Sequence, residues 1–122
     1  MAATSQMISL EANIITSFPF DELSQFSKLS YFKIRDNSLS MIPADAFYGL
    51  TALEYLDISG NHANIVGTFQ DLPNLQSISL YSNALTTIPV HFIKNGSSDL
   101  SYIALHYNDI VSVEPYAFDI VD

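Results

Sequence analysis

The chain has 122 residues, about the length of one domain, and 48% of them are hydrophobic, a fraction too high for a disordered protein. Thirteen acidic residues against four basic ones give a net charge of −9, which disfavours phosphate backbones and anionic lipid heads as partners. The absence of cysteine excludes disulfides, thiol nucleophiles and cysteine-ligated zinc, and no apolar run approaches a membrane span. We therefore predict no nucleic-acid partner and no direct membrane contact from this segment.

One motif, centred on asparagine, recurs five times along the chain. Apolar residues stand at its first, fourth and sixth positions, followed by asparagine and one more apolar residue, as in Leu29-x-x-Phe32-x-Ile34-x-x-Asn37-x-Leu39; the first copy departs from this only in having Ser5 at the first position. The asparagines are Asn13, Asn37, Asn61, Asn83 and Asn108, at steps of 24, 24, 22 and 25 residues. This period predicts a repeat protein with one solenoid domain over 1–122 and repeats over about 5–28, 29–52, 53–74, 75–99 and 100–122.

Each repeat combines a strand with a second, less regular half. The fourth and sixth motif positions are two residues apart, so their side chains share one face of a short strand. In the second half, Ile42-Pro43 and Ile88-Pro89 precede aromatic residues that we expect to fill the core from the convex side: Phe47, Phe92 and Phe118. Phe18-Pro19 with Leu23 and Phe26 is a looser version of the same pattern.

On these motifs the chain resembles the leucine-rich repeat family, in its typical extracellular-type subclass, over essentially its whole length. The resemblance implies a right-handed α/β solenoid of about five coils. Short parallel strands would line its concave side and irregular or short helical segments its convex side. It also implies that each asparagine bonds backbone groups of its own turn and of the next coil, which would make a ladder.

The two ends show no polar cap, which a solenoid needs where its core would otherwise meet water. We therefore expect a fragment of a longer array, with further repeats of the same chain at both ends and the caps missing. An intact short protein that oligomerises end to end is the alternative.

No catalytic constellation is found in the sequence. His62, His91 and His106 fall at three different repeat positions, so they are not expected to converge on one metal ion. The four glycines are scattered and form no phosphate-binding loop. We predict that the chain is not an enzyme and that it has no catalytic residue, cofactor or metal.

Strand residues that alternate with the core positions must point outward on the concave side. This surface is rich in tyrosine and also contains basic residues, a composition typical of recognition surfaces. The alternative is that the tyrosines are only good strand formers that pack on one another, while Lys33 and Arg35 neutralise Asp57 and Glu11 laterally. We predict a protein-binding site made of Tyr31, Lys33, Arg35, Tyr55, Asp57, Tyr81, Tyr102, His106 and Tyr107.

Location is indicated by the repeat subclass and by one modification motif. Asn95-Gly96-Ser97 is a glycosylation sequon in a stretch with loop composition. Residues 1–6 have no signal-peptide character, so either the protein is cytosolic or its amino-terminal part is missing from this chain. We predict the secreted or extracellular compartment, with a cytosolic protein as the alternative.

Three functions remain open for such a module. The first is recognition of a protein ligand on the concave strands. The second is that of an accessory, non-catalytic subunit of a secreted enzyme complex. It is suggested by the ending Pro115–Asp122, which is similar to that of secreted arthropod proteins related to the non-catalytic subunit of a shrimp luciferin monooxygenase. The third is a structural spacer between other domains.

Overall fold

The computed structural model describes residues 5–64 and 67–119, and within them the chain forms a solenoid of about five turns with parallel strands. The predicted fold, with short strands on one side and irregular or short helical segments on the other, is confirmed. The elements in chain order are β1 (Gln6–Ser9), η1 (Phe20–Gln25, a 3₁₀ helix), β2 (Leu29–Lys33), β3 (Tyr55–Asp57), β4 (Phe69–Gln70), β5 (Ser77–Ser79), β6 (Thr87–Ile88), β7 (Ile93–Lys94), β8 (Tyr102–Ala104), β9 (Ser112–Val113) and β10 (Phe118–Asp119).

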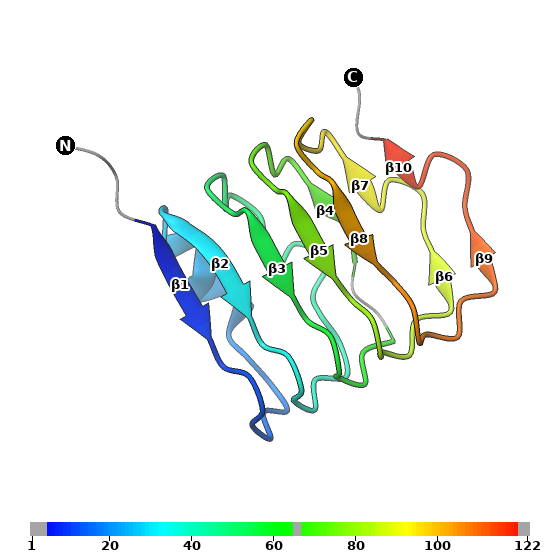
Figure 1. The fold of residues 1–122 in the computed structure, drawn as a ribbon, viewed down its shortest axis with the longest axis horizontal. Coiled ribbons are helices and arrows are strands. Elements are labelled where there is room, and N and C mark those ends of the chain that lie inside the picture. The colour runs from blue at the N-terminus through cyan, green and yellow to red at the C-terminus, as the bar shows by residue number, and fades with distance from the viewer. Residues whose placement is uncertain (1–4, 65–66, 120–122) are drawn as a thin grey trace.

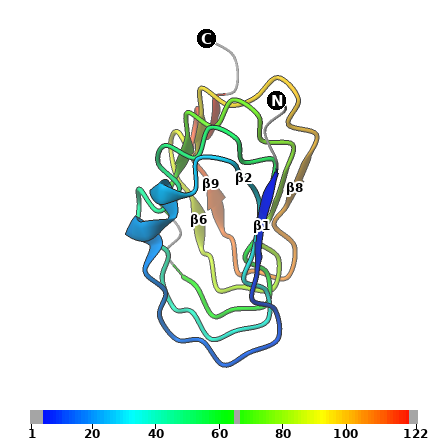
Figure 2. The same ribbon diagram turned by 90° about the vertical axis from the view of Figure 1, so that its left-hand side faces the viewer.

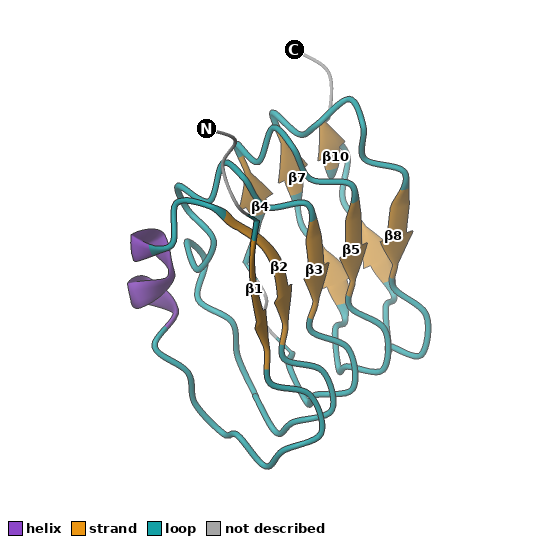
Figure 3. Ribbon diagram, turned by 60° about the vertical axis from the view of Figure 1, so that its left-hand side comes forward, coloured by secondary structure: helices purple, strands orange, loops and turns teal. Residues whose placement is uncertain are grey.

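The strands form three parallel sheets. The main sheet has the order β1-β2-β3-β5-β8, with one strand from each coil (Figure 1). A ladder in the order β10-β7-β4 and the pair β6-β9 belong to the second halves of the coils. The helix η1 lies on the side away from the main sheet (Figure 2), and most of the remaining chain is loop (Figure 3). We call the outer surface of the main sheet the strand face, and the opposite side, with β4, β7, β10 and η1, the back side.

The motif residues form the core between these two sides. Leu53, Leu56 and Ile58 are buried, and their alternate neighbours face outward because side chains alternate along a strand. In the first and last coils the equivalent side chains, such as Ile8 and Ile103, are only partly buried. Within the described residues, each of these two coils packs against one other coil. The core is therefore shared between coils, so no single coil can bury its own apolar face.

Phenylalanine rings, one from each coil, form a continuous aromatic spine through the back of the core. Successive ring centroids are 5.8, 5.8, 5.2 and 6.2 Å apart, within the range of favourable aromatic contacts. The spine consists of Phe20, Phe47, Phe69, Phe92 and Phe118. Phe47 and Phe92 thus fill the core from the back as predicted, whereas Phe118, in the last coil, is 44% exposed.

The first coil differs from the looser pattern that the sequence indicated. Phe26 is 41% exposed, and Phe20 occupies the expected core place instead. Side chains three residues apart eclipse one another in a 3₁₀ helix. Phe20 and Leu23 therefore share the buried face of η1, and Phe26 follows the helix, with its N–H donating to the carbonyl of Leu23.

The repeat asparagines bond backbone groups of two coils. Asn61 donates to the carbonyl oxygens of Ile58, in its own coil, and Ile34, in the preceding coil, at 3.0 and 3.2 Å, and its Oδ1 accepts the N–H of Leu39 at 3.0 Å. The same pattern recurs at Asn37, Asn83 and Asn108.

The second bonded coil is thus the preceding one, and the expectation that it would be the next one was wrong. The physical reason lies in the parallel ladder, in which N–H groups alternate in direction: Leu10 donates toward the following coil, to Lys33, whereas Glu54 donates toward the preceding coil, to Ser30. Two residues after each of the first four asparagines the N–H points toward the following coil, where Oδ1 of the next asparagine accepts it.

The chain reaches each asparagine through a residue in the left-handed backbone conformation. The residues immediately before the five asparagines have φ between 56° and 71°, and only one of them is glycine: Ala12, Asp36, Gly60, Ser82 and Tyr107. This conformation costs a non-glycine residue roughly 1–2 kcal/mol. The asparagine bonds therefore stabilise a turn that the local residue types disfavour.

Candidate functional site on the strand face

The register of the main sheet lines up the side chains of the strand face in rows. Tyr31 pairs with Tyr55, Tyr55 with Ser77, and Ser77 with Tyr102. Two residues further along each strand, a second row consists of Lys33, Asp57, Ser79 and Ala104. The predicted site residues on β2, β3 and β8 therefore lie on one surface, at positions set by hydrogen-bonded strands.

Tyr31 and Tyr55 form the first aromatic group of this surface. Their ring centroids are 4.6 Å apart and their planes differ by 10°, a spacing close to the roughly 4.8 Å between neighbouring strands. The Tyr55 hydroxyl donates to Oε1 of Gln76 at 2.9 Å, and Nε2 of Gln76 donates to Oε1 of Glu54 at 3.0 Å. These contacts hold the Tyr55 ring in one orientation in the unbound protein.

A second group joins Arg35, Tyr81 and His106, which follow β2, β5 and β8. The rings of Tyr81 and His106 are stacked at 4.7 Å with planes 10° apart, and the guanidinium carbon of Arg35 lies 5.7 Å from the centroid of the Tyr81 ring. Arg35 reaches Tyr81 across the intervening coil, whose equivalent residue is the small Ser59. Ser59 is buried, and its hydroxyl bonds that of Ser79 at 2.7 Å. The small side chain of Ser59 therefore leaves room for a cation–π contact that spans three coils.

The remaining predicted residues are less closely joined. Tyr102 is 51% exposed and is separated from Tyr55 by Ser77 in its row. Tyr107 is 78% exposed and stands at the turn, with its ring 5.0 Å from that of His106. The site thus comprises two fixed groups, with Tyr102 and Tyr107 as more exposed neighbours.

Charges on the strand face do not pair across the strands. The Nε of Arg35 lies 3.5 Å from Oδ2 of the adjacent Asp36, and a carboxylate oxygen of Asp57 accepts the N–H of Ser59 at 3.0 Å. Among the residues that the structure describes, neither basic residue of this face has an ion pair with Asp57 or Glu11. Lys33 and Asp57 are nevertheless register partners on neighbouring strands, so lateral neutralisation without a direct ion pair stays an alternative prediction.

Sequence reasoning missed the supporting residues of this site. Glu54 and Gln76 occupy the same repeat position, directly after the first apolar residue of the motif, so their side chains meet on neighbouring coils. A polar residue at that position in several repeats is a signal that could have identified them. Alternation along the strand would make Ser59 an outward position, whereas it is buried and bonded to Ser79, which spacing alone could not predict.

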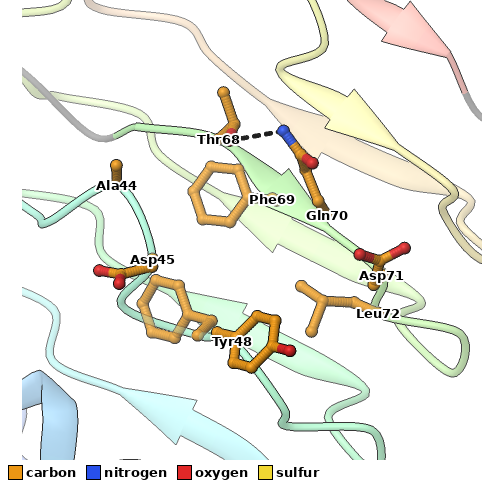
Figure 4. Close-up of a pocket in the computed structure, with 9 residues that line it drawn as sticks. Ala44, Asp45, Tyr48, Thr68, Phe69, Gln70, Asp71 and Leu72 are labelled. Atoms are coloured by element: carbon orange, nitrogen blue, oxygen red, sulfur yellow. Dashed lines mark hydrogen bonds between the residues drawn. The ribbon is translucent and has the colours of Figure 1, made fainter.

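The back side has two hollows that the sequence did not indicate. One, of about 250 Å³, is lined mainly by Phe47, Tyr48, Phe69 and Leu72, with Asp45 and Asp71 at opposite sides (Figure 4). The other, of about 370 Å³, lies between η1 and the following coil and is lined mainly by Phe18, Phe20, Asp21, Pro43, Asp45 and Tyr48. Tyr48, which is 75% exposed, borders both hollows. A tyrosine directly after the buried Phe47 of the spine was the available signal.

Within residues 5–64 and 67–119, no three histidine, aspartate or glutamate side chains gather in a way that would hold a metal ion. Nor does that part of the chain contain a helix of the length and apolarity that a bilayer crossing requires. The strand face and the two back hollows are therefore the surfaces whose chemistry needs explanation.

Comparison with known proteins is consistent with the architecture. The family model for the leucine rich repeat matches residues 6–62. The chain is 31% identical over 91% of its length to the Oplophorus-luciferin 2-monooxygenase non-catalytic subunit of Oplophorus gracilirostris. It is 27% identical over 83% of its length to podocan of Mus musculus, and 25% identical over 91% to podocan-like protein 1 of Homo sapiens. The chain spans 38%, 21% and 27% of the lengths of these relatives, respectively.

Proposed function

Because this chain is a leucine-rich-repeat protein, we propose that it is a non-enzymatic recognition module that binds a protein partner on the strand face. The observation that carries the proposal is the second aromatic group, in which Arg35, Tyr81 and His106 lie in one row, with the coil of Ser59 between Arg35 and Tyr81. Tyrosine and arginine dominate binding energy at protein interfaces. Since ring and cation–π contacts already order these side chains, fixing them in a complex has a small entropic cost.

Two further features support recognition rather than chemistry. The strand face presents rings, hydroxyls, a guanidinium and an ammonium group over several coils, which suits a broad protein surface better than a small molecule. The relatives include a subunit described as non-catalytic, and leucine-rich-repeat domains typically mediate protein–protein interaction. We place the protein outside the cell on the basis of its relatives, and expect its partner there.

A second candidate is an accessory role beside a catalytic subunit in a secreted complex. It is favoured by the 31% identity to the non-catalytic subunit of the Oplophorus luciferin monooxygenase, which extends over 91% of this chain. In this case the strand face would bind the catalytic partner. The two candidates share one surface and differ in the identity of the protein bound to it. A structural spacer, in contrast, would need no partner on this face.

Photo-crosslinking tests the surface. With p-benzoylphenylalanine in place of Tyr102, on the strand face, the 122-residue chain is expected to capture a specific protein from the extracellular fluid of its source. The same probe in place of Tyr116, which is 78% exposed but lies outside the main sheet, is expected to capture none of it. Identification by mass spectrometry of a known oxidoreductase subunit would favour the accessory role. Equal capture at both positions would contradict the proposed site.

Affinity for the captured protein tests the residues. The double variant Arg35→Ala/Tyr55→Ala is expected to weaken binding tenfold or more, because truncating arginine or tyrosine at an interface centre typically costs more than about 1 kcal/mol each. The matched control Lys28→Ala/Tyr116→Ala removes a base and a tyrosine outside the strand face and is expected to change affinity less than about twofold. Calorimetric titration measures both, and equal losses would argue against strand-face recognition.

We also propose that Asn95 carries an N-linked glycan. Asn95-Gly96-Ser97 is the only such triplet in the sequence, and Asn95 is exposed, with Nδ2 2.9 Å from Oδ1 of Asp71. In secreting eukaryotic cells, the protein is expected to lose the mass of one glycan on treatment with peptide N-glycosidase. Asn95→Gln should abolish this shift and Asn74→Gln should leave it intact. A wild-type protein without the shift would refute the proposal.

A further inference from the structure

The two hollows of the back side are built around one short turn. Tyr48 donates its N–H to the carbonyl of Asp45 at 3.1 Å, a bond between residues three apart. Side chains three apart eclipse one another in 3₁₀ geometry. The residues between them, Ala46 and Phe47, are buried, whereas Asp45 and Tyr48 are exposed and border both hollows. The turn therefore presents a carboxylate and an aromatic ring together, outward and between two concavities.

The charges around this turn have one sign. The first hollow is bordered by Asp45 and Asp71 and the second by Asp21 and Asp45, and the lining of neither hollow includes lysine, arginine or histidine. Asp71 accepts a hydrogen bond from Asn95 at 2.9 Å. For the side chain of Asp45, the described part of the chain offers neither an ion pair nor a hydrogen bond. Asp45 is thus available to a cation, and unlike Asp21 it borders both hollows.

The walls of the hollows add an apolar contribution. Phe47, Phe69 and Leu72 are buried and form the floor of the first hollow, and Figure 4 shows Tyr48 beside them. Volumes of about 250 and 370 Å³ lie just below and just above the lower limit of ligand pockets, which span roughly 300–1,000 Å³. Each hollow is therefore suited to a single side chain or a short segment rather than to a large ligand.

We propose that the turn Asp45–Tyr48 and its two hollows are a second docking site, which receives an arginine side chain of a partner protein. A guanidinium group is planar and stacks on an aromatic ring while its N–H groups pair with a carboxylate, a combination that an ammonium group matches less well. The arginine would lie against Tyr48, with Asp45 accepting its N–H groups. Its apolar stem would cover the floor of one hollow.

The occupant is a different protein rather than a second copy of this chain. The sequence has a single arginine, Arg35, on the strand face, where it already contacts Tyr81 and lies beside Asp36. A net charge of −9 also makes two copies repel each other, whereas it attracts a cationic partner. The back-side site is independent of the strand face, so a partner could use either surface or both.

Titration of the 122-residue chain with acetyl-arginine amide, followed by nuclear magnetic resonance, tests the site. We expect weak, millimolar binding with the largest shift changes at the amides of residues 45–48. The uncharged isostere acetyl-citrulline amide is expected to bind at least about fivefold more weakly, since it lacks the charge that both contacts require. Equal binding of the two probes, or shift changes centred on the strand face, would overturn the proposal.

Variants separate the ring from the carboxylate. Tyr48→Ala is expected to weaken acetyl-arginine amide binding about two- to fivefold, whereas Tyr48→Phe, which keeps the ring, should stay within about twofold of the original affinity. Asp45→Asn should weaken binding about threefold, and Asp109→Asn, the same charge change at an exposed position outside both hollows, should not. Equal effects of Asp45→Asn and Asp109→Asn would show that only the net charge is recognised and would refute the site.

Discussion

Replacement of Asn61 by alanine is expected to lower the free energy of unfolding by about 3 kcal/mol, although the side chain lies outside both proposed binding sites. The substitution leaves the N–H of Leu39 without a partner in a buried environment, which costs roughly 1–3 kcal/mol. It also removes the bonds to the carbonyl groups of Ile34 and Ile58, worth about 1 kcal/mol each. Each of these two carbonyl oxygens still accepts a bond from another asparagine, Asn37 for Ile34 and Asn83 for Ile58. Neither oxygen is therefore left without a partner, and no further desolvation cost is added.

Asn13→Ala is the matched control, because it is the same substitution at the same repeat position. Asn13 is exposed, and its side chain donates only to Leu10 and Glu11 within its own turn. A cost of less than about 1 kcal/mol is expected there. Urea unfolding followed by circular dichroism measures both variants. Equal destabilisation would show that the asparagines act only within their own turns, and that the bonds between coils contribute nothing.

Much of the fold could be predicted because one coil cannot bury its apolar face alone. This physical requirement repeats the same residue types at the same spacing, so the period and the alternation along each strand identify the core and the strand face. The rows that contain Tyr31, Tyr55 and Tyr102 follow from the two-residue alternation together with the parallel register.

Features that depend on direction or reach were not predictable in this way. The spacing of the asparagines is the same whichever neighbouring coil they bond, so the direction depends on which way the N–H two residues after each asparagine points. Likewise, spacing places Arg35 and Tyr81 on the same surface but two coils apart. Their contact depends on the small Ser59 between them and on the length of the arginine side chain. The back hollows depend on how a turn of irregular sequence packs against the aromatic spine.

The aromatic spine gives the second large effect: Phe69→Ala is expected to destabilise the protein by roughly 3–5 kcal/mol, the usual cost of truncating a buried phenylalanine. Phe69 belongs to the shortened third repeat, which lacks the isoleucine–proline step that identified Phe47 and Phe92 in the sequence. It is nevertheless 2% exposed, and its ring lies 5.8 Å from Phe47 and 5.2 Å from Phe92. Because Phe69 belongs to the middle coil, the cavity left by the substitution would remove its ring contacts with both neighbouring coils.

Phe26→Ala provides the comparison within the same chain, since Phe26 is 41% exposed and has no contact with the rings of the spine. Its cost should stay near or below about 1 kcal/mol, as for other substitutions away from the core. Denaturant unfolding of the two variants decides whether the spine couples the coils. In a solenoid each coil contacts only its neighbours, so loss of the central ring is expected to separate the two halves energetically and to broaden the transition. A sharp transition with similar midpoints for both variants would mean that the strand ladder and the asparagines alone hold the coils together.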